Sequence, residues 1–275
     1  MRMSRRMGLL GGGGIAASTT LNDNAWDVIR AVSDAGQGEN FWSVGDCKEI
    51  VLNGTVGNLT LSNFTTYAFI IGFDHNASIE GSGRIHFQLA KTALSSGTDI
   101  GLCDKKFSGM VTANGYFSMN KSSNNTGGWE SSQMRANICG TSLTDYQGTI
   151  ISVIPEALRA VLKTITKYTN NVSGISTDAS AVTATTDFFF LLSEYEIFGS
   201  CTYANASEAD YQEQYAYYSA GNSTIKYKHS DPETAFAWWL RSPSGSNMFI
   251  NVRAAGTLGR TTANYSYGFA PGFCV

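Results

Sequence analysis

Charge is scarce in this sequence. Charged residues make up 15% of the 275 residues, the net charge at pH 7 is -3, and only three His are present. Lys and Arg form no stripe of the kind that neutralises the phosphates of nucleic acid. No apolar run approaches the roughly 20 residues that cross a bilayer. We therefore expect no nucleic-acid partner and no insertion into a membrane.

The signatures of common enzymes and metal sites are missing as well. The sequence has no G-x-S-x-G, no P-loop and no H-E-x-x-H motif. Its cysteines are widely and irregularly spaced, without a CxxC pair. We expect free, mostly buried thiols, with no metal and no cofactor. The five cysteines are Cys47, Cys103, Cys139, Cys201 and Cys274.

Three short patterns could carry chemistry, and a structural interpretation is favoured for each. Gly81-Ser82-Gly83 lacks the third glycine and the following helix of a phosphate loop, so it predicts a turn. Asp74-His75-Asn76 offers metal ligands, but adjacent residues do not converge easily on one ion, which again favours a turn. Glu194 and Glu196 would share a strand face and could serve acid and base steps, although a solvated or Arg-paired face is the preferred interpretation.

The sequence does contain enough material for a large core, with 43% hydrophobic and 12% aromatic residues. Periodicity predicts one α+β domain with a mixed, mainly antiparallel sheet and two or three helices. A polar connection over 170–186 and an insertion over 203–231, near the C-terminal segment, complete this picture. The expected helices are 25–35, 128–138 and 155–168, and the expected strands are 41–44, 49–52, 67–73, 84–89 and 188–192.

The N-terminal 22 residues allow two interpretations. Arg5-Arg6 followed by small residues is typical of a twin-arginine export signal. Gly11–Gly14 would make a poor apolar region for such a signal, because each glycine costs a helix about 1 kcal/mol. The favoured interpretation is a flexible attachment tail over 1–22, followed by a single domain over 23–275.

The C-terminal segment has an unusual composition. Trp238–Pro243 opens it, Gly268–Val275 closes it, and small and aromatic residues lie between. Phe249–Tyr267 contains no Lys, Glu, Gln, Met or Trp, which are the residues that random change of the two adenines in an AAC or AAT codon cannot produce. This composition fits targeted diversification, and it also fits an ordinary polar C-terminus.

Several longer motifs favour the first of these interpretations. The segments Trp129–Arg135, Phe190–Gly199, Trp238–Pro243 and Gly268–Val275 resemble a domain family of unknown function that is common in gut Firmicutes and their phages. That family is similar to the variable proteins of diversity-generating retroelements. The resemblance implies a C-type lectin fold, in the branch shared with formylglycine-generating enzymes. Phe41–Asp46 and Ile71–Asn76 extend it to about residues 23–275.

The resemblance also implies roles for the C-terminal residues. Buried scaffold side chains would hold a variable region at about 244–267, and Arg241 would pair with a buried acceptor. The expected scaffold residues are Trp238, Trp239, Arg241, Pro243, Phe269, Pro271 and Phe273. The expected exposed ligand-binding residues are Ser244, Ser246, Asn247, Asn251, Arg253, Ala254, Thr257, Gly259, Arg260, Thr261, Thr262, Asn264, Tyr265 and Tyr267.

Function is expected to follow from that variable face. A binding protein displayed on a phage virion or a bacterial surface would recognise a host-surface protein or glycan, assembling through its N-terminus and acting in several copies. One alternative is an oxidising or modifying enzyme related to formylglycine-generating enzymes, for which the sequence offers no convincing copper-binding cysteine pair. A structural virion decoration protein is another.

Overall fold

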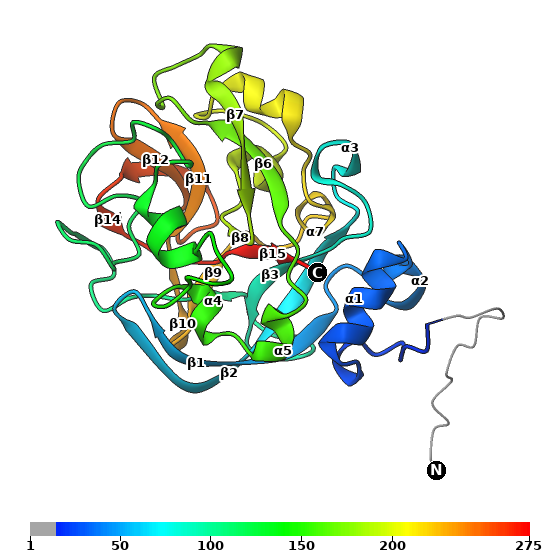
Figure 1. Cartoon of the computed structure of the whole chain (residues 1–275). Helices are drawn as coiled ribbons and strands as arrows, with labels where there is room; N and C mark the ends of the chain where they lie inside the picture. The colour runs from blue at the N-terminus through cyan, green and yellow to red at the C-terminus, as the bar shows by residue number, and fades with distance from the viewer. Residues whose placement is uncertain (1–14) are drawn as a thin grey trace.

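The largest sheet lies at the centre of the molecule and includes the C-terminal strand. The computed structural model describes residues 15–275. The sheet is antiparallel, and β15 lies between β3 and β8, so the last residues of the chain complete the core rather than its surface (Figure 1). Its strands, in spatial order, are β1 (Cys47–Val56), β2 (Leu59–Phe73), β3 (Ile85–Lys91), β15 (Gly272–Cys274) and β8 (Phe189–Phe190).

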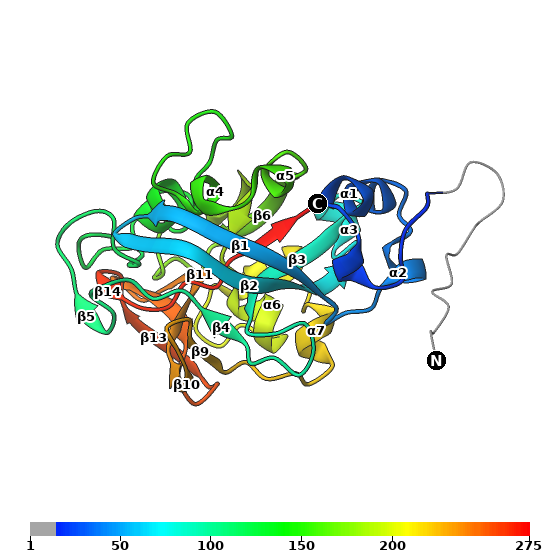
Figure 2. The same cartoon turned by 90° about the horizontal axis from the view of Figure 1, so that it is seen from below.

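Four smaller sheets surround it, mostly built from short antiparallel strands. Figure 2 places β11, β13 and β14 on the side of the molecule away from α1. The first small sheet contains β11 (Trp238–Ser244), β12 (Met248–Val252) and β13 (Leu258–Thr262), and the second pairs β14 (Tyr265–Ser266) with β5 (Gly109–Met110). The others are β10 (Asp231–Phe236), β9 (Lys226–Lys228) and β4 (Ile100–Gly101), and the pair β6 (Ile165–Asn170) and β7 (Val182–Asp187).

The helices are short, and α1 (Trp26–Asp34) is the longest. It buries Trp26, Ile29 and Val32 on one face, as helical spacing requires. The Trp26 ring packs edge-on against Phe87 of β3 at 5.6 Å. The remaining helical segments are η1 (Leu21–Asp23), α2 (Gly38–Phe41), α3 (Ala77–Glu80), η2 (Met134–Cys139), α4 (Ile150–Val153), α5 (Glu156–Arg159), η3 (Ala179–Ala181), α6 (Glu194–Phe198), η4 (Ala206–Tyr211) and α7 (Ala216–Ser219).

The mixed, mainly antiparallel α+β architecture is confirmed. The helix expected over 25–35 is present as α1. The helix expected over 155–168 is wrong, because α5 ends at Arg159 and β6 begins at Ile165. The β-branched residues Thr164, Ile165 and Thr166 favour extended backbone there, and buried and half-buried residues alternate in β6 as far as Thr169.

Three other expected elements also differ. Residues 41–44 form no strand, since α2 ends at Phe41 and a turn follows in which Ser43 N donates to Asp46 Oδ2 at 2.9 Å. The expected helix 128–138 is helical only from Met134 onward, in a π-type segment over Met134–Cys139. Glu194 and Glu196 lie on helix α6 and not on a strand, because Ser193 caps that helix through a reciprocal bond with Glu196.

The expected domain boundary moves towards the N-terminus. Ala17 and Leu21 are buried in the core, so residues 15–22 pack as part of the domain. Residues 1–14 of the expected attachment tail lie outside the described residues. No helix in residues 15–275 combines the length and the apolarity that crossing a membrane requires.

Candidate functional site

The three-stranded sheet β11–β12–β13 carries most of the residues expected to contact ligand. Its antiparallel register pairs Met248 with Thr262 and Val252 with Leu258. Successive turns of such a meander lie at opposite ends of the middle strand. Because β12 spans five residues, or roughly 17 Å, the turn after β11 and the turn after β12 lie far apart. The expected contact residues therefore divide into two groups and do not form one continuous surface.

The first group lies at the turn between β11 and β12. Ser246 is exposed, and Asn247, Thr262 and Asn264 are half-buried. Asn247 Nδ2 donates to Ser123 Oγ at 2.9 Å, and Ala263 N donates to Asn247 O at 2.9 Å. These bonds bring the turn, the end of β13 and the loop around Ser123 together.

Two half-buried tyrosines extend the first group. The ring centroids of Tyr265 and Tyr267 lie 5.1 Å apart, and Tyr267 also contacts the buried ring of Trp239 at 5.1 Å. Thr261 Oγ1 donates to the Tyr267 hydroxyl at 3.4 Å. We call the set Ser246, Asn247, Thr261, Thr262, Asn264, Tyr265 and Tyr267 the tyrosine face.

The second group lies at the opposite end of β12. Arg253, Ala254 and Thr257 are exposed around the turn between β12 and β13. Arg260, which is also exposed, pairs with Ile250 in the middle of β12, and its guanidinium lies 4.7 Å from the centre of the Tyr203 ring and donates to Ser244 Oγ at 3.4 Å, towards the turn between β11 and β12. Arg253, Ala254 and Thr257 are accessible, but they lie at the turn far from the tyrosine face.

Three residues expected to be exposed are buried, which corrects the sequence prediction. Ser244 Oγ donates to Tyr203 O at 3.1 Å. Asn251 Nδ2 donates to Thr261 Oγ1 at 3.1 Å. A Cβ on Gly259 would lie 2.7 Å from Asn251 Oδ1, so a larger residue there would displace its neighbour. The packing of β11–β13 against one another and against neighbouring segments leaves none of these three residues exposed.

A neighbouring loop that sequence reasoning did not single out borders the tyrosine face. Met110, 63% exposed, pairs with Tyr265 across β5 and β14. Asn120 N donates to Ala263 O at 2.9 Å, next to an open polar groove of about 380 Å³. The clustering of Asn and Ser over 114–126 is the sequence signal that could have indicated it. The groove is lined by Asn114, Asn120, Lys121, Ser122, Asn124, Thr126, Ser131, Ser132, Gln133, Ala136 and Asn137.

The expected scaffold residues anchor both ends of this region. Trp238, Trp239, Arg241, Phe269 and Phe273 are fully buried. Pro243 and Pro271 are buried too. Phe273 stacks on Phe87 of β3 at 5.3 Å, which ties the C-terminal strand to the central sheet. The tyrosine face is therefore attached to the core at both of its sequence ends.

Arg241 pairs with a buried acceptor, and that acceptor is Glu196. The guanidinium donates to Glu196 Oε1 at 3.0 Å, makes a closer bond to Oε2, and also donates to Leu191 O at 2.9 Å. Burial opposes ionisation of Glu196, but the charges of Arg241 and Lys167 outweigh it and hold the pKa of Glu196 well below its ordinary value. A charged clamp thus fixes β11 to helix α6.

Lys167 extends this clamp towards the central sheet. Its ammonium donates to Glu196 at 2.8 Å, to Glu80 at 2.7 Å and to the Tyr215 hydroxyl at 2.9 Å. Burial raises the pKa of Glu80 to about 7, against the opposing effect of Lys167. Strand β6 directs Lys167 inward because buried Ile165, Lys167 and Thr169 alternate with half-buried residues.

His75 joins the same buried cluster. The turn expected at Asp74–Asn76 is present, with positive φ at Asp74 and Asn76. Ligand atoms of His75, Glu80 and Glu196 lie within 4.8 Å of one another, and burial lowers the pKa of His75 to about 3. His75 Nε2 and Glu80 Oε2 have no hydrogen-bond partner among the described residues.

These residues fit a metal ion poorly. The ammonium of Lys167 already binds both carboxylates, and Lys167 and Arg241 together balance the charges of Glu80 and Glu196. A divalent cation would bring uncompensated charge into a buried site, which costs several kcal/mol. The arrangement is that of a structural ion-pair network. The five cysteines are free thiols, four of them buried.

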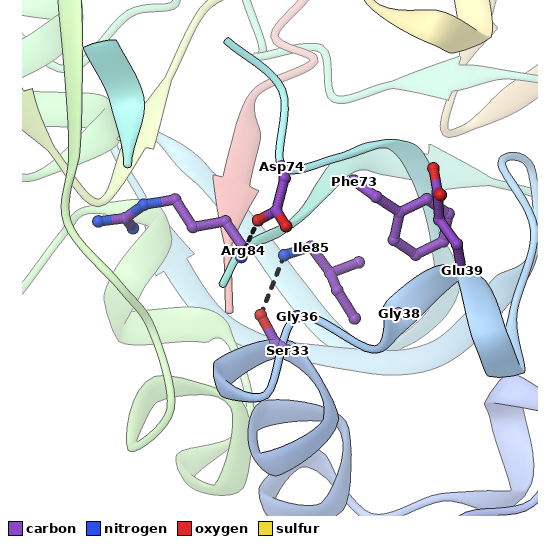
Figure 3. Close-up of a pocket in the computed structure, with 8 residues that line it drawn as sticks. All are labelled: Ser33, Gly36, Gly38, Glu39, Phe73, Asp74, Arg84 and Ile85. Atoms are coloured by element: carbon purple, nitrogen blue, oxygen red, sulfur yellow. Dashed lines mark hydrogen bonds between the residues drawn. The ribbon is translucent and has the colours of Figure 1, made fainter. Parts of the chain in front are cut away.

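A small hollow of about 100 Å³ lies near the start of β3 (Figure 3). Asp74 Oδ1 accepts from Arg84 N at 2.8 Å, and Ser33 Oγ accepts from Ile85 N at 3.1 Å. Both polar side chains therefore hold the connection between β2 and β3. The Arg84 side chain extends away from Asp74 and out of the hollow.

Comparison with known families identifies the C-terminal three-fifths of the chain. Residues 107–275 match the model of a family described as a domain of unknown function (DUF6273). The chain belongs to this family. The DUF6273 segment contains Lys167, Glu196 and Arg241 as well as the tyrosine face, whereas His75 and Glu80 precede it. A search of curated proteins finds no match, and neither does a search of solved structures.

Proposed function

We propose that the protein is a ligand-binding module that recognises a host-surface protein or glycan through the tyrosine face. The observation that carries this proposal is the contrast in burial between the two ends of the C-terminal segment and the residues between them. Its ends are fully buried and held by the Arg241–Glu196 clamp and by Phe273, while the side chains of the tyrosine face are exposed or half-exposed. A surface fixed at both ends can change its side chains without unfolding the domain.

The residue types of this face suit recognition. Tyr265 and Tyr267 offer rigid contact area and a hydroxyl at a low entropic cost. Asn247 and Asn264 add amide groups, and exposed Met110 adds an adaptable apolar contact beside Tyr265. The adjoining polar groove of about 380 Å³ extends the same surface. Together they provide aromatic anchors inside a polar rim.

The finer assignment is also part of this proposal. We infer a C-type lectin fold and a variable protein of a diversity-generating retroelement, displayed on a phage virion or a bacterial surface. The motifs Trp238–Pro243 and Gly268–Val275 support it, and so does the composition of Phe249–Tyr267, which a change of adenines could produce. The partner would then differ between sister proteins.

The neighbouring DNA tests the retroelement assignment. We expect a near-copy of the 3′ end of this gene, with adenines at the codons of the exposed residues, beside a gene for a reverse transcriptase. A genome in which neither lies near the gene would contradict the assignment, while leaving the binding proposal open to a direct test.

Cell binding tests the recognition itself. Fluorescently labelled protein, linked into tetramers, is incubated with a panel of gut bacterial strains and bound fluorescence is measured by flow cytometry. We expect binding to at least one strain, and we expect Tyr265→Ser with Asn264→Ser to abolish it. Thr257→Ser, at the far turn, is the matched control and should bind as the wild type does.

Two outcomes would count against recognition by this face. Equal loss of binding in the Thr257→Ser control would place the contact elsewhere. Absence of binding to every strain, in a protein that still assembles on particles, would instead favour a structural decoration protein. Melting curves of each variant establish that lost binding does not reflect unfolding.

A further inference from the structure

A second groove lies on the other side of the molecule from the tyrosine face. It has a volume of about 430 Å³, within the range of small-molecule sites. Helix α1, the turn before β3 and the segment before β6 line this open groove. In Figure 2, α1 lies close to α5 and the C-terminus. The lining residues are Arg30, Asp34, Ser82, Arg84, Leu162, Lys163, Thr164 and Phe188.

The lining is positive although the whole chain is negative. Three cations and one carboxylate line the groove, which leaves a surplus of two positive charges. Arg30 Nε lies 2.9 Å from Asp34 Oδ2, and Lys163 Nζ lies 2.6 Å from Asp34 Oδ1, so two cations share one acid. Within residues 15–275, no carboxylate forms an ion pair with the third cation, Arg84.

Arg84 keeps donor capacity unused. Its Nη1 donates to Thr164 O at 2.7 Å, which fixes the side chain across the groove. Its Nε is buried and has no hydrogen-bond partner in the described part of the chain. Asp74 does not neutralise the guanidinium, because Figure 3 shows the Arg84 side chain extending away from that carboxylate. A buried donor without a partner costs about 1 to 3 kcal/mol, so the protein leaves part of the hydrogen-bonding capacity of this guanidinium unsatisfied.

The positive charges of Arg30 and Arg84 also affect Lys163. Burial lowers the pKa of Lys163, and the nearby charges of Arg30 and Arg84 add to the lowering, although Asp34 opposes it. Lys163 Nζ also bonds to Gly83 O, which attaches the groove to the turn before β3. The three cations are therefore held close together by protein contacts before any anion arrives.

The Gly81–Ser82–Gly83 turn forms the rim of this groove. Both glycines have positive φ, 88° and 66°, which L side chains rarely adopt. A Cβ on Gly83 would also lie 3.2 Å from Ser33 O. The two glycines therefore let the turn pack against α1 and leave Ser82 exposed at the groove.

We propose that this groove binds the phosphate group of a small phosphate monoester. A phosphate monoester carries about 1.5 to 2 negative charges at pH 7, which matches the surplus of two positive charges. Guanidinium groups bind phosphate oxygens through paired, charge-assisted bonds. Half-buried Phe188 and buried Leu162 supply apolar area for the organic part of the ligand.

Isothermal titration calorimetry with phenyl phosphate and with inorganic phosphate tests the proposal on the full chain. Acetate and chloride at equal ionic strength serve as reference anions. We expect saturable binding of both phosphates, tighter for phenyl phosphate because of Phe188 and Leu162, and no saturable binding of acetate or chloride. Binding of all four anions alike, or of none, would overturn the proposal.

Substitutions at the rim separate binding from folding. Ser82 is exposed, so Ser82→Asp adds a negative charge without removing a core contact, and Ser82→Asn is its neutral match. We expect Ser82→Asp to weaken phenyl phosphate binding at least about tenfold and Ser82→Asn to change it little. Arg84→Gln should weaken it similarly, and exposed Lys105→Gln, which removes an equal charge elsewhere, should not.

Equal affinity in the wild type and Ser82→Asp would show that phosphate binds outside this groove and would contradict the assignment. Equal weakening by Lys105→Gln and Arg84→Gln would do the same, since it would reduce the effect to net charge. Thermal melting of the Arg84→Gln variant without ligand distinguishes lost binding from lost structure, and Ser82→Asp remains decisive if that variant unfolds.

Discussion

At the scale of single residues, the most consequential feature is a buried network of four charges. Arg241, Glu196, Lys167 and Glu80 connect β11, α6, β6 and α3. The family resemblance implied that Arg241 would pair with a buried acceptor, and that acceptor is Glu196. The sequence did not predict Lys167, since lysine in a threonine-rich segment resembles an exposed residue.

Loss of Arg241 should destabilise the fold severely. Arg241→Met leaves Glu196 buried with one cation fewer, and breaking a buried pair costs about 3 to 5 kcal/mol of unfolding free energy. Urea denaturation measures the difference. Arg260→Met, at an exposed position of β13, should change the unfolding free energy by no more than about 0.5 kcal/mol. A similar loss of unfolding free energy in both variants would mean that the Arg241–Glu196 pair stabilises the fold no more than an exposed arginine does.

Glu80 should make stability depend on pH in an unusual direction. Its pKa rises from 4.5 to about 7 in the folded state, so the folded protein holds this proton more tightly than the unfolded chain. The contribution of Glu80 is therefore fully present below pH 4.5 and is lost as the pH rises through 7. Denaturation midpoints at pH 5, 6 and 7 should fall more steeply in the wild type than in Glu80→Gln. A steeper fall in the variant would contradict the assignment.

At the scale of elements, apolar periodicity predicted the helices and strands that are set by core packing. It missed those that are set by local features such as helix capping. Helix α1 and strands β2 and β3 follow from their apolar patterns. The helix expected over 155–168 was wrong because Ile165 and Tyr168 have helical spacing but lie on β6, where Ile165 and Lys167 are buried and Tyr168 is only half-buried. The position of Glu196 was wrong because a capping box started a helix where a strand was expected.

The order of the strands also explains why the expected binding residues divide into two groups. Composition marked the segment 244–267 but could not place its turns, and an antiparallel meander puts successive turns at opposite ends. Burial of Ser244, Asn251 and Gly259 depends on Tyr203 and on side-chain contacts between neighbouring strands. Such contacts between segments distant in sequence are not visible in the sequence of one chain.

Gly259 should therefore tolerate substitution worse than its neighbour on the same strand. Gly259→Val would force a side chain against Asn251 Oδ1, and overpacking of this kind costs about 1 to 3 kcal/mol. Thr262→Val, at a half-buried position of β13, should have a small effect. Thermal melting compares the two, and a more stable Gly259→Val variant would restore Gly259 to the set of freely variable positions.

At the scale of the whole molecule, one core supports two surfaces with different expected roles. Strand β14, which carries Tyr265 of the tyrosine face, and helix α1, which lines the positive groove, lie on opposite sides of the molecule (Figure 2). Few anchors leave a single binding face with little surplus over the cost of association. Several copies on one particle would raise the avidity by orders of magnitude, so display in multiple copies is expected.

The N-terminal residues should serve this display and not the fold. Deleting residues 1–14 keeps the bond from Ser18 N to Asn24 Oδ1 and the packing of Ala17 and Leu21 against the rest of residues 15–275. We expect an unchanged melting temperature and a loss of incorporation into particles or oligomers. Normal incorporation of the truncated chain, or mass spectrometry that finds the segment cleaved from the native protein, would replace the attachment role with the export-signal interpretation.

The central claim is that the tyrosine face varies freely on a fixed core, and a paired library measures this most directly. One library randomises Ser246, Asn247, Thr262, Asn264 and Tyr265, and the other randomises Trp238, Trp239, Glu196, Arg241 and Phe273. Folding is scored by protease resistance and melting temperature. We predict that most members of the first library fold with nearly unchanged melting temperatures, because surface changes cost about 0.5 kcal/mol or less each, and that most members of the second do not fold. Failure of most members of the first library to fold would contradict the claim.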